Sequence, residues 1–430
     1  MIHMAKITFI GAGSVVFASR LLSDIFSHSE LAESTISLMD INPERLDLIT
    51  KLARLMASKY APKAKIESTL NRRESLKDAD YVIIMIQVGG LEAFEKDILI
   101  PLKYDVNQEV GDTIGPGGVF RGLRTIPVLL GICRDMEELC SDALLINYAN
   151  PMAINCWAMN EATSIKNVGL CHSVQGTAMQ LARYINVPYE DVSYWVAGIN
   201  HQAFFLEYKY KGKDAYPLIW EAMKRKEIYE KDKVRFEMMK YLGYFITESS
   251  HHLSEYLPYF RTTEERRREY CEPRWFYLEI CQKAWKPHYE RIQRQIRGEE
   301  PIEIRRSHEY GIDIIYSMET GDPCRINGNV RNEGLITNLP QGCCVEVPCL
   351  VDKNGIHPCY VGDLPPQCAV LNRTNINVQE LAVKAALEKD RAAVVQAVMF
   401  DPLTSALLTP REIERMVNEL FEAEAKWLQF

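Results

Sequence analysis

A cysteine stands directly beside a histidine in the segment GLCHSVQG, residues 169–176, and His201 follows in the segment GINHQAFF. A thiolate is a nucleophile and a metal ligand, and an imidazole binds metals or transfers protons near neutral pH. Neighbouring cysteine and histidine residues are nevertheless common, and packing in a core explains Cys171 and His201 when each is taken alone. The pair therefore becomes informative only through the elements that position it.

The chain opens on a pattern typical of a dinucleotide-binding turn. The apolar strand KITFI is followed by a G-x-G pair and then by a helical pattern, which lets a pyrophosphate approach backbone N–H groups at a helix N-terminus. Val16 occupies the third glycine position, so the fingerprint is incomplete. An acid ends the second strand, where it would accept hydrogen bonds from both ribose hydroxyls and favour NAD over NADP; a tight turn beside a strand-end acid is the alternative. The predicted cofactor site comprises Gly11, Gly13, Ser14, Val15, Asp40 and Gln87.

Strands and helices alternate through the first part of the chain. The strand-like segments are KITFI, STISLMDIN, AKIESTL, YVIIMIQV, ALLINYANP and NVGLCH, and a long loop is expected between YVIIMIQVGG and the helix RTIPVLLGICRDMEELC. This alternation predicts an α/β fold with a doubly wound parallel sheet. Residues 1–192 are therefore predicted to form an NAD-binding Rossmann domain, similar to that of lactate and malate dehydrogenases.

The pattern changes near Val192. The segment SYWVAGINHQAFFLEYKY alternates like antiparallel strand, residues 215–300 are helical and highly charged, and residues 324–372 are rich in turns and strands. Two helices, NVQELAVKAALEKDRAAVVQAVMF and PREIERMVNELFEAEAKWL, are expected to close the chain. We predict a second, α+β domain over residues 193–430 that carries catalytic, substrate-binding and subunit contacts.

Composition excludes several classes of partner. The net charge of −8 argues against nucleic acid or an anionic membrane surface as the main partner, and no segment approaches 18 uninterrupted apolar residues. The N-terminus shows no signal-peptide pattern, so a cytoplasmic protein with reduced thiols is expected. Six of the twelve cysteines fall between Cys324 and Cys368 without a CxxC pair, which favours buried thiols over a structural zinc site.

A dehydrogenase and a dinucleotide-sensing protein are two functions that such a fold would allow. The Asn-Pro of NYANPM also occurs in lactate and malate dehydrogenases, but their catalytic histidine lies in G-x-x-H-G, whereas Gln202 follows His201 here. This difference weakens the hypothesis of a simple NAD-dependent dehydrogenase of a sugar or hydroxyacid. It stays an alternative, as does a dinucleotide-sensing protein without activity.

Five ordered blocks resemble glycoside hydrolase family 4: FIGAGS, GDTIGPGGVFRGLRTIP, NYANPM, GLCHSVQG and GINHQAFF. The likeness continues through GYFITESSHHLSEYLPYF, and the Cys-His-Ser-Val form of the central block is similar to the α-galactosidase branch. NAD-dependent members of this family are exceptions to the two-carboxylate mechanism of glycosidases. The resemblance implies hydrolysis of α-galactosides of the melibiose type by a homodimer or homotetramer, with α-galacturonidase or α-glucosidase activity as the alternatives.

The resemblance also implies the chemistry. It places Mn²⁺ or another divalent ion on Cys171 and His201, although thiolate is soft and Mn²⁺ prefers oxygen. The sugar is oxidised at C3 by hydride transfer to NAD⁺, the C2 proton is removed, the aglycone is eliminated, water adds, and the hydride returns. The metal stabilises the enediolate as a Lewis acid. The net reaction is hydrolysis without consumption of NAD.

Further residues take roles by the same resemblance. The acid position falls on His172, the sugar-binding asparagine on Asn150, and the tyrosine base on Tyr244 or Tyr241, with Tyr244 preferred. Phosphosugar members carry an arginine where this chain has Phe94, and the loss of that guanidinium favours a non-phosphorylated sugar. A galacturonide carboxylate would need another cation, for which the candidates are Arg121, Arg124 and Arg261.

Overall fold

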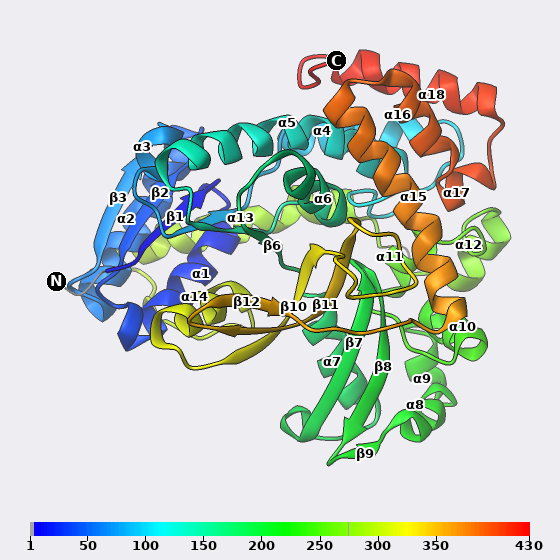
Figure 1. The fold of residues 1–430 in the computed structure, drawn as a ribbon, viewed down its shortest axis with the longest axis horizontal. Coiled ribbons are helices and arrows are strands. Elements are labelled where there is room, and N and C mark those ends of the chain that lie inside the picture. Colours follow the sequence, from blue (N-terminus) through cyan, green and yellow to red (C-terminus); the bar gives the residue numbers. More distant parts are fainter. Residues whose placement is uncertain (1–3, 274) are drawn as a thin grey trace.

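Six parallel strands form the first half of a twelve-stranded sheet in the computed structural model, which describes residues 4–273 and 275–430 (Figure 1). Their spatial order is β3-β2-β1-β4-β5-β6, the order of doubly wound dinucleotide-binding folds. The fold class predicted from the sequence is thus confirmed. The strands are β1 (Lys6–Ile10), β2 (Thr35–Met39), β3 (Lys65–Thr69), β4 (Tyr81–Ile84), β5 (Leu144–Asn147) and β6 (Asn167–Gly169).

Helices cover both faces of this parallel sheet; in Figure 1, α5 and α6 lie on one side of it and α1 on the other. Every residue of β4 and β5 is buried, as expected for strands covered on both faces. The first-half helices are α1 (Val15–Ser27), α2 (Pro43–Tyr60), α3 (Arg72–Leu76), α4 (Gly90–Leu102), α5 (Gly115–Leu139), α6 (Met152–Ala162) and α7 (Ser173–Tyr184), with a 3₁₀ turn at Ser29–Leu31.

The prediction of a long loop before RTIPVLLGICRDMEELC is wrong, because most of that segment is helical. Helix α4 begins after Gly89, whose φ of 78° is left-handed, and α5 begins nine residues before the predicted helix start at Arg124. Glycines at both helix starts and Pro101 inside α4 concealed the helical pattern. The two helices pack against each other, and the segment between them places Asp112 beside Asn150, which follows β5.

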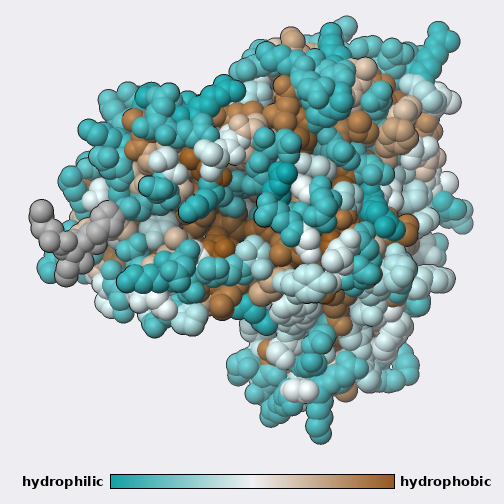
Figure 2. Space-filling view, in the orientation of Figure 1, coloured by the Kyte–Doolittle hydropathy of each residue, from teal (hydrophilic) through white to brown (hydrophobic). Residues whose placement is uncertain are grey.

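The sheet continues without a break into the second half of the chain. Strand β6 pairs antiparallel with β10 through Gly169 and Asn329, and β11, β7, β8 and β9 follow, with β12 on β11. The hairpin of β7 and β8 projects from the body of the molecule (Figures 1 and 2). Since the sheet crosses residue 192, the proposed division into domains 1–192 and 193–430 stays a prediction. The strands are β7 (Val192–Ile199), β8 (Gln202–Tyr210), β9 (Lys213–Asp214), β10 (Cys324–Arg331), β11 (Cys344–Asp352) and β12 (Gly355–Pro358).

Most of the remaining helices lie where charged helical pattern was expected. The first of the two predicted closing helices is divided at Lys389, which adopts a left-handed φ of 56°, and Asp390 caps the second part. The elements are a 3₁₀ turn (Tyr189–Asp191), α8 (Tyr216–Met223), α9 (Lys226–Tyr229), α10 (Lys233–Leu242), α11 (Ser250–Glu255), α12 (Glu264–Tyr270), α13 (Tyr277–Ile296), α14 (Tyr310–Thr320), α15 (Pro366–Glu388), α16 (Arg391–Met399), α17 (Pro402–Ser405) and α18 (Pro410–Glu424).

The main hydrophobic core extends through both halves, from β1 to α18, and a second core packs α7 against β7, β8 and α10. A fully buried guanidinium, Arg124 of α5, ties the main core together: one nitrogen lies 2.8 Å from both the Asp97 Oδ1 of α4 and the Glu424 Oε2 of α18. The twelve cysteines are free thiols, buried or half-buried. Within residues 4–273 and 275–430, no helix has the length and apolar character needed to cross a membrane.

Candidate active site

Three side chains of metal-binding type meet beside the end of β6. Cys171 follows β6, His201 lies in the turn between β7 and β8, and Glu248 stands just before α11. The Cys171 Sγ lies 3.2 Å from the His201 Nε2, and that nitrogen lies 3.9 Å from the Glu248 Oε2. All three ligand atoms lie within 4.8 Å of one another. The structure brings together the two ligands expected from the sequence and adds a third.

The backbone at two of these residues is held in an uncommon conformation. His201 has a φ of 63° and Glu248 a φ of 77°, both left-handed. A left-handed conformation costs free energy in residues other than glycine. Residues held in such conformations are often found at functional sites. At His201 the conformation forms the two-residue turn of the β7–β8 hairpin, which points the imidazole toward Cys171.

The three side chains fit a divalent cation. Burial raises the pKa of the Cys171 thiol, but the charge of His201 outweighs this effect and brings the pKa to about 7. Burial lowers the pKa of His201, whereas the Cys171 thiolate raises it to about 10. The pair thus favours thiolate and imidazolium, and a metal ion would replace the shared proton. Glu248 would supply the oxygen ligand that Mn²⁺ prefers and that the sequence prediction lacked.

A second layer of contacts fixes these ligands. The His252 Nδ1 lies 3.5 Å from the Glu248 Oε1, and burial lowers the pKa of His252 to about 4, so it is neutral near pH 7. The Thr113 Oγ1 lies 3.5 Å from the His201 Nδ1 and accepts a 2.8 Å hydrogen bond from the Tyr256 hydroxyl. Such contacts orient metal ligands and commonly control affinity for the ion.

Of three tyrosines near this region, the one next to the cluster is Tyr256. It is buried, and its ring centroid lies 6.4 Å from that of His201. Tyr241 is 81% exposed at the end of α10, and Tyr244 packs edge-on against Tyr216. The structure therefore gives neither tyrosine predicted from the sequence a contact with the cluster within the described residues. Glu248 and Tyr256 both stand in the block GYFITESSHHLSEYLPYF, which could have pointed to them.

Asn150 lies beside a carboxylate that the sequence did not single out. Its Nδ2 donates a 2.9 Å hydrogen bond to the Asp112 Oδ2, and its carbonyl accepts one of 3.2 Å from Arg121. The Asp112 Oδ1 is buried and has no hydrogen-bond partner among the described residues. Buried acceptors are normally paired, so this oxygen is suited to a ligand hydroxyl.

The three candidate arginines differ in what they contact. Arg124 is committed to Asp97 and Glu424, and Arg261 donates to both oxygens of Asn107. Arg121 is the one that contacts Asn150, and its guanidinium lies 5.7 Å from the centre of the Phe94 ring. A substrate anion near Asn150 would therefore meet Arg121 first.

His172 points toward an acidic partner from the C-terminal half. Its Nε2 lies 2.5 Å from the Glu309 Oε1, which also accepts a 2.9 Å hydrogen bond from Arg20. Burial lowers the pKa of His172, but the Glu309 carboxylate raises it more, and the net shift is upward. With its side chain 52% exposed, His172 can hold a proton near neutral pH and present it to a ligand.

The predicted cofactor residues line the ends of β1, β2 and β4. A Cβ on Gly13 would stand 2.7 Å from the Asp40 Oδ2, and Gly11 has a left-handed φ of 90°. Ser14, the N-cap of α1, makes no side-chain cap hydrogen bond, so the N–H groups from Val15 onward remain available to an anion. The Asp40 carboxylate accepts hydrogen bonds from the Gly13 and Asn42 N–H groups at 2.7 and 2.8 Å, which holds it beside the glycine turn.

Gln87 follows β4 at this same edge of the sheet. Its side chain is exposed, and its Nε2 donates to the Gly90 carbonyl at 3.3 Å. The predicted cofactor residues thus lie where the strand order reverses between β1 and β4, the usual position of a ligand in open α/β sheets.

Comparison with known proteins decides the family. The model named Family 4 glycosyl hydrolase matches residues 6–187, and the model of that family's C-terminal domain matches residues 196–404. The chain belongs to family 4 of the glycosyl hydrolases. An α-galactosidase of Bacillus subtilis (strain 168) is 44% identical over 429 residues, which cover 99% of each chain. An α-galactosidase of Rhizobium meliloti (strain 1021) is 38% identical and covers 98% of this chain and 89% of its own.

Other members of family 4 are more distant. An α-galacturonidase of Thermoanaerobacterium saccharolyticum is 30% identical, covering 99% of this chain and 97% of its own. A solved 6-phospho-α-glucosidase from gut microorganisms, in complex with NAD and Mn²⁺, has a TM-score of 0.85 at 20% identity and covers 99% of each chain. A malate dehydrogenase of Plasmodium falciparum with NADH has a TM-score of 0.55 at 14% identity, covering 89% and 99%. The two structural likenesses confirm the fold, and the family match confirms a glycosidase rather than a dehydrogenase or a sensor.

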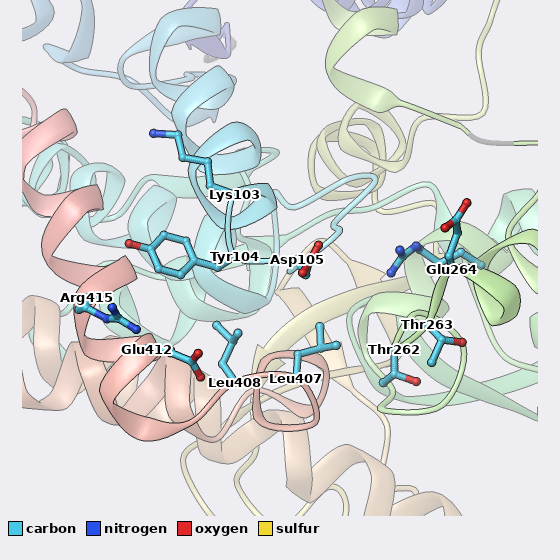
Figure 3. Close-up of a pocket in the computed structure, with 11 residues that line it drawn as sticks. Lys103, Tyr104, Asp105, Thr262, Thr263, Glu264, Leu407, Leu408, Glu412 and Arg415 are labelled. Atoms are coloured by element: carbon cyan, nitrogen blue, oxygen red, sulfur yellow. The ribbon is translucent and has the colours of Figure 1, made fainter.

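A separate surface pocket of about 520 Å³ lies between the end of α4, the start of α12 and the start of α18 (Figure 3). Lys103, Asp105, Glu264 and Arg415 present charges of both signs to it. None of the residues predicted for the site lines this pocket.

Proposed function

We propose that this family 4 glycosyl hydrolase is an NAD- and divalent-metal-dependent α-galactosidase that acts on melibiose-type substrates. The 44% identity to an α-galactosidase over the whole chain carries the proposal. The α-galacturonidase and α-glucosidase relatives named as alternatives are each 30% identical at most. The cluster of Cys171, His201 and Glu248 supports the dependence on a metal.

The residues around Phe94 support a sugar without phosphate. Phe94 is fully buried against Ile98 and Leu278, so this position offers no charge to a phosphate. The Nε of the nearby Arg121 donates a hydrogen bond to the Asn150 carbonyl, and the guanidinium lies 3.9 Å from the Asp112 carboxylate. A cation already neutralised in this way attracts a second anion less strongly.

Two bound groups would supply chemistry that side chains lack. NAD bound at Gly11, Gly13 and Asp40 would accept and return a hydride. A divalent ion such as Mn²⁺ on the cluster would act as a Lewis acid. A solved 6-phospho-α-glucosidase with this fold contains both NAD and Mn²⁺. The glycine turn of this chain, and its cluster of sulfur, nitrogen and oxygen donors, support the proposal that it binds the same two groups.

The chain's own residues would position the sugar and move protons. Asn150 and the unpaired Asp112 oxygen would hold hydroxyl groups, and His172 would donate a proton to the leaving oxygen. The base that takes the C2 proton is proposed among Tyr241, Tyr244 and Tyr256. Contacts favour Tyr256, because its hydroxyl is linked through Thr113 to His201.

A reducing compartment suits this site. A thiolate ligand and eleven further free cysteines would be exposed to oxidation outside the cell, so we propose that the enzyme acts in the cytoplasm. A homodimer or homotetramer remains the expected assembly. Size-exclusion chromatography with light scattering would measure it.

The substrate is tested by measuring kcat/KM side by side on an α-galactoside, an α-galacturonide and an α-galactoside 6-phosphate. A charge-assisted contact is worth about 1.5–3 kcal/mol, so the missing arginine predicts a preference of roughly ten- to a hundredfold for the free galactoside over its phosphate. A higher value for the phosphorylated sugar would contradict the interpretation of Phe94. A higher value for the galacturonide would retain the family and change the substrate.

Replacing Gly13 by alanine tests the proposed NAD-binding site. The new methyl group would collide with the Asp40 Oδ2 at 2.7 Å and with the Arg45 Cβ at 2.9 Å, and it would keep a pyrophosphate from the backbone. We expect the Kd for NAD, measured by calorimetry, to rise at least about tenfold, or about 1.4 kcal/mol. Gly176→Ala, where a Cβ meets open space, is the matched control and should bind NAD like the parent.

A further inference from the structure

A second pocket, of about 420 Å³, is lined in part by the two residues on either side of Glu309, the partner of His172. We name it the tyrosine pocket; it is lined by Gln175, Tyr189, Tyr194, Arg306, Tyr310 and Arg325, among others. Its volume falls in the range of small-molecule sites, and nothing in the proposed chemistry has used it so far.

The tyrosine pocket and the proposed acid are held by the same two segments of the chain, the start of α7 and residues 308–310. Gln175 follows His172 by three residues across the start of α7, so both side chains lie on one side of that helix. Glu309, which holds His172, stands between His308 and Tyr310, and these two residues line the pocket. A ligand in the pocket would therefore lie close to the side chains of His172 and Glu309.

Gln175, which lines the pocket, has a buried acceptor. The Gln175 side chain is 5% exposed, and its Nε2 donates to the His308 carbonyl at 3.4 Å. Its Oε1 has no hydrogen-bond partner among the described residues. A buried acceptor without a partner is destabilising, and a hydroxyl donor from a ligand would satisfy it.

The remaining lining has the chemistry of a sugar site. The Tyr189 and Tyr194 hydroxyls lie 3.2 Å apart, and the Arg325 guanidinium lies 5.4 Å from the centre of the Tyr194 ring. Arg306 holds Asp313 at 2.6 Å. Aromatic rings offer flat apolar area to the C–H face of a pyranose, while phenols, guanidinium groups and a carboxylate exchange hydrogen bonds with its hydroxyls.

We propose that the tyrosine pocket binds the sugar on the leaving side of the scissile bond, so that the enzyme selects oligosaccharide α-galactosides over simple ones. The inference rests on the proposed function. A group that protonates the leaving oxygen must face the leaving group, and the pocket adjoins that group. Contacts with a remote part of a substrate raise kcat/KM for the substrates that possess it.

The experiment compares raffinose, whose leaving group is sucrose, with methyl α-galactoside, which places no sugar in the pocket. In Arg325→Ala and Tyr310→Phe we expect kcat/KM for raffinose to fall about five- to tenfold through KM, with methyl α-galactoside changed less than about twofold. Inhibition by free sucrose should weaken in parallel. Arg331→Ala is the matched control: it lies at the other end of β10, where it pairs with Glu161 at 3.2 Å, and should behave like the parent.

Two results would overturn the inference while leaving the proposed function intact. One is an equal loss on both substrates, and the other is unchanged kinetics on raffinose in both variants. Failure of the parent enzyme to hydrolyse methyl α-galactoside would instead contradict the proposed function. Circular dichroism and thermal melting of Arg325→Ala and Tyr310→Phe ensure that the comparison is made on folded protein.

Discussion

Replacing Cys171 by serine is expected to lower kcat for α-galactosides about 1,000-fold, which corresponds to about 4 kcal/mol of lost transition-state stabilisation. The thiolate lies 3.2 Å from the His201 Nε2 and is the sulfur member of the three-residue cluster. A neutral hydroxyl binds a divalent ion far less well than a thiolate whose proton the site already displaces. Electron paramagnetic resonance of free Mn²⁺ should show weaker binding in the same variant.

Cys359→Ser is the control, because Cys359 is a half-buried thiol outside the cluster. It should keep parental activity and Mn²⁺ binding. Treatment of the parent with a chelator should abolish activity, and Mn²⁺ with a reductant should restore it. Full activity of Cys171→Ser without added metal would remove the metal assignment.

Replacing Tyr256 by phenylalanine is expected to lower kcat by about 100- to 10,000-fold, the usual contribution of a general base. The substitution keeps the buried ring and removes only the hydroxyl that donates to Thr113. Burial raises the pKa of Tyr256 well above its ordinary value, and a divalent ion on the cluster would lower it toward the working range. Exchange of deuterium at C2 of the substrate should be lost together with hydrolysis.

The parallel variants Tyr241→Phe and Tyr244→Phe decide between the three tyrosines. Tyr241 is exposed and should tolerate the change, and Tyr244 contacts Tyr216 rather than the cluster. A loss of C2 exchange in Tyr244→Phe with Tyr256→Phe active would favour the tyrosine preferred from the sequence and contradict the role given to Tyr256.

The parallel half of the fold could be predicted from local patterns, because each of its strands is a short apolar run followed by an amphipathic helix. The same rules missed α4, where Gly89, Gly90 and Pro101 interrupt the pattern, and the break between α15 and α16 at Lys389. They could not show that β6 pairs with β10, since antiparallel pairing across more than 150 residues leaves no local signal.

The site divides in the same way. Cys171, His201, Asn150 and the glycine turn stand in short blocks that resemble the family, so their types and order were visible in the sequence. Glu248 and Tyr256 join them only through folding, from a helical segment in which charged and aromatic residues are frequent. Asp112 likewise becomes informative only when the structure shows one oxygen accepting from Asn150 and the other without a partner in the described part of the chain.

Hydrolysis of an α-galactoside in D₂O, with the product examined by proton NMR, tests the central claim most directly. Oxidation, elimination and re-reduction require the C2 proton to leave and a solvent deuteron to replace it, without net formation of NADH. The account predicts deuterium at C2 of the released galactose and a constant absorbance at 340 nm during turnover. Galactose that remains fully protiated at C2 would contradict the elimination pathway and every role that rests on it.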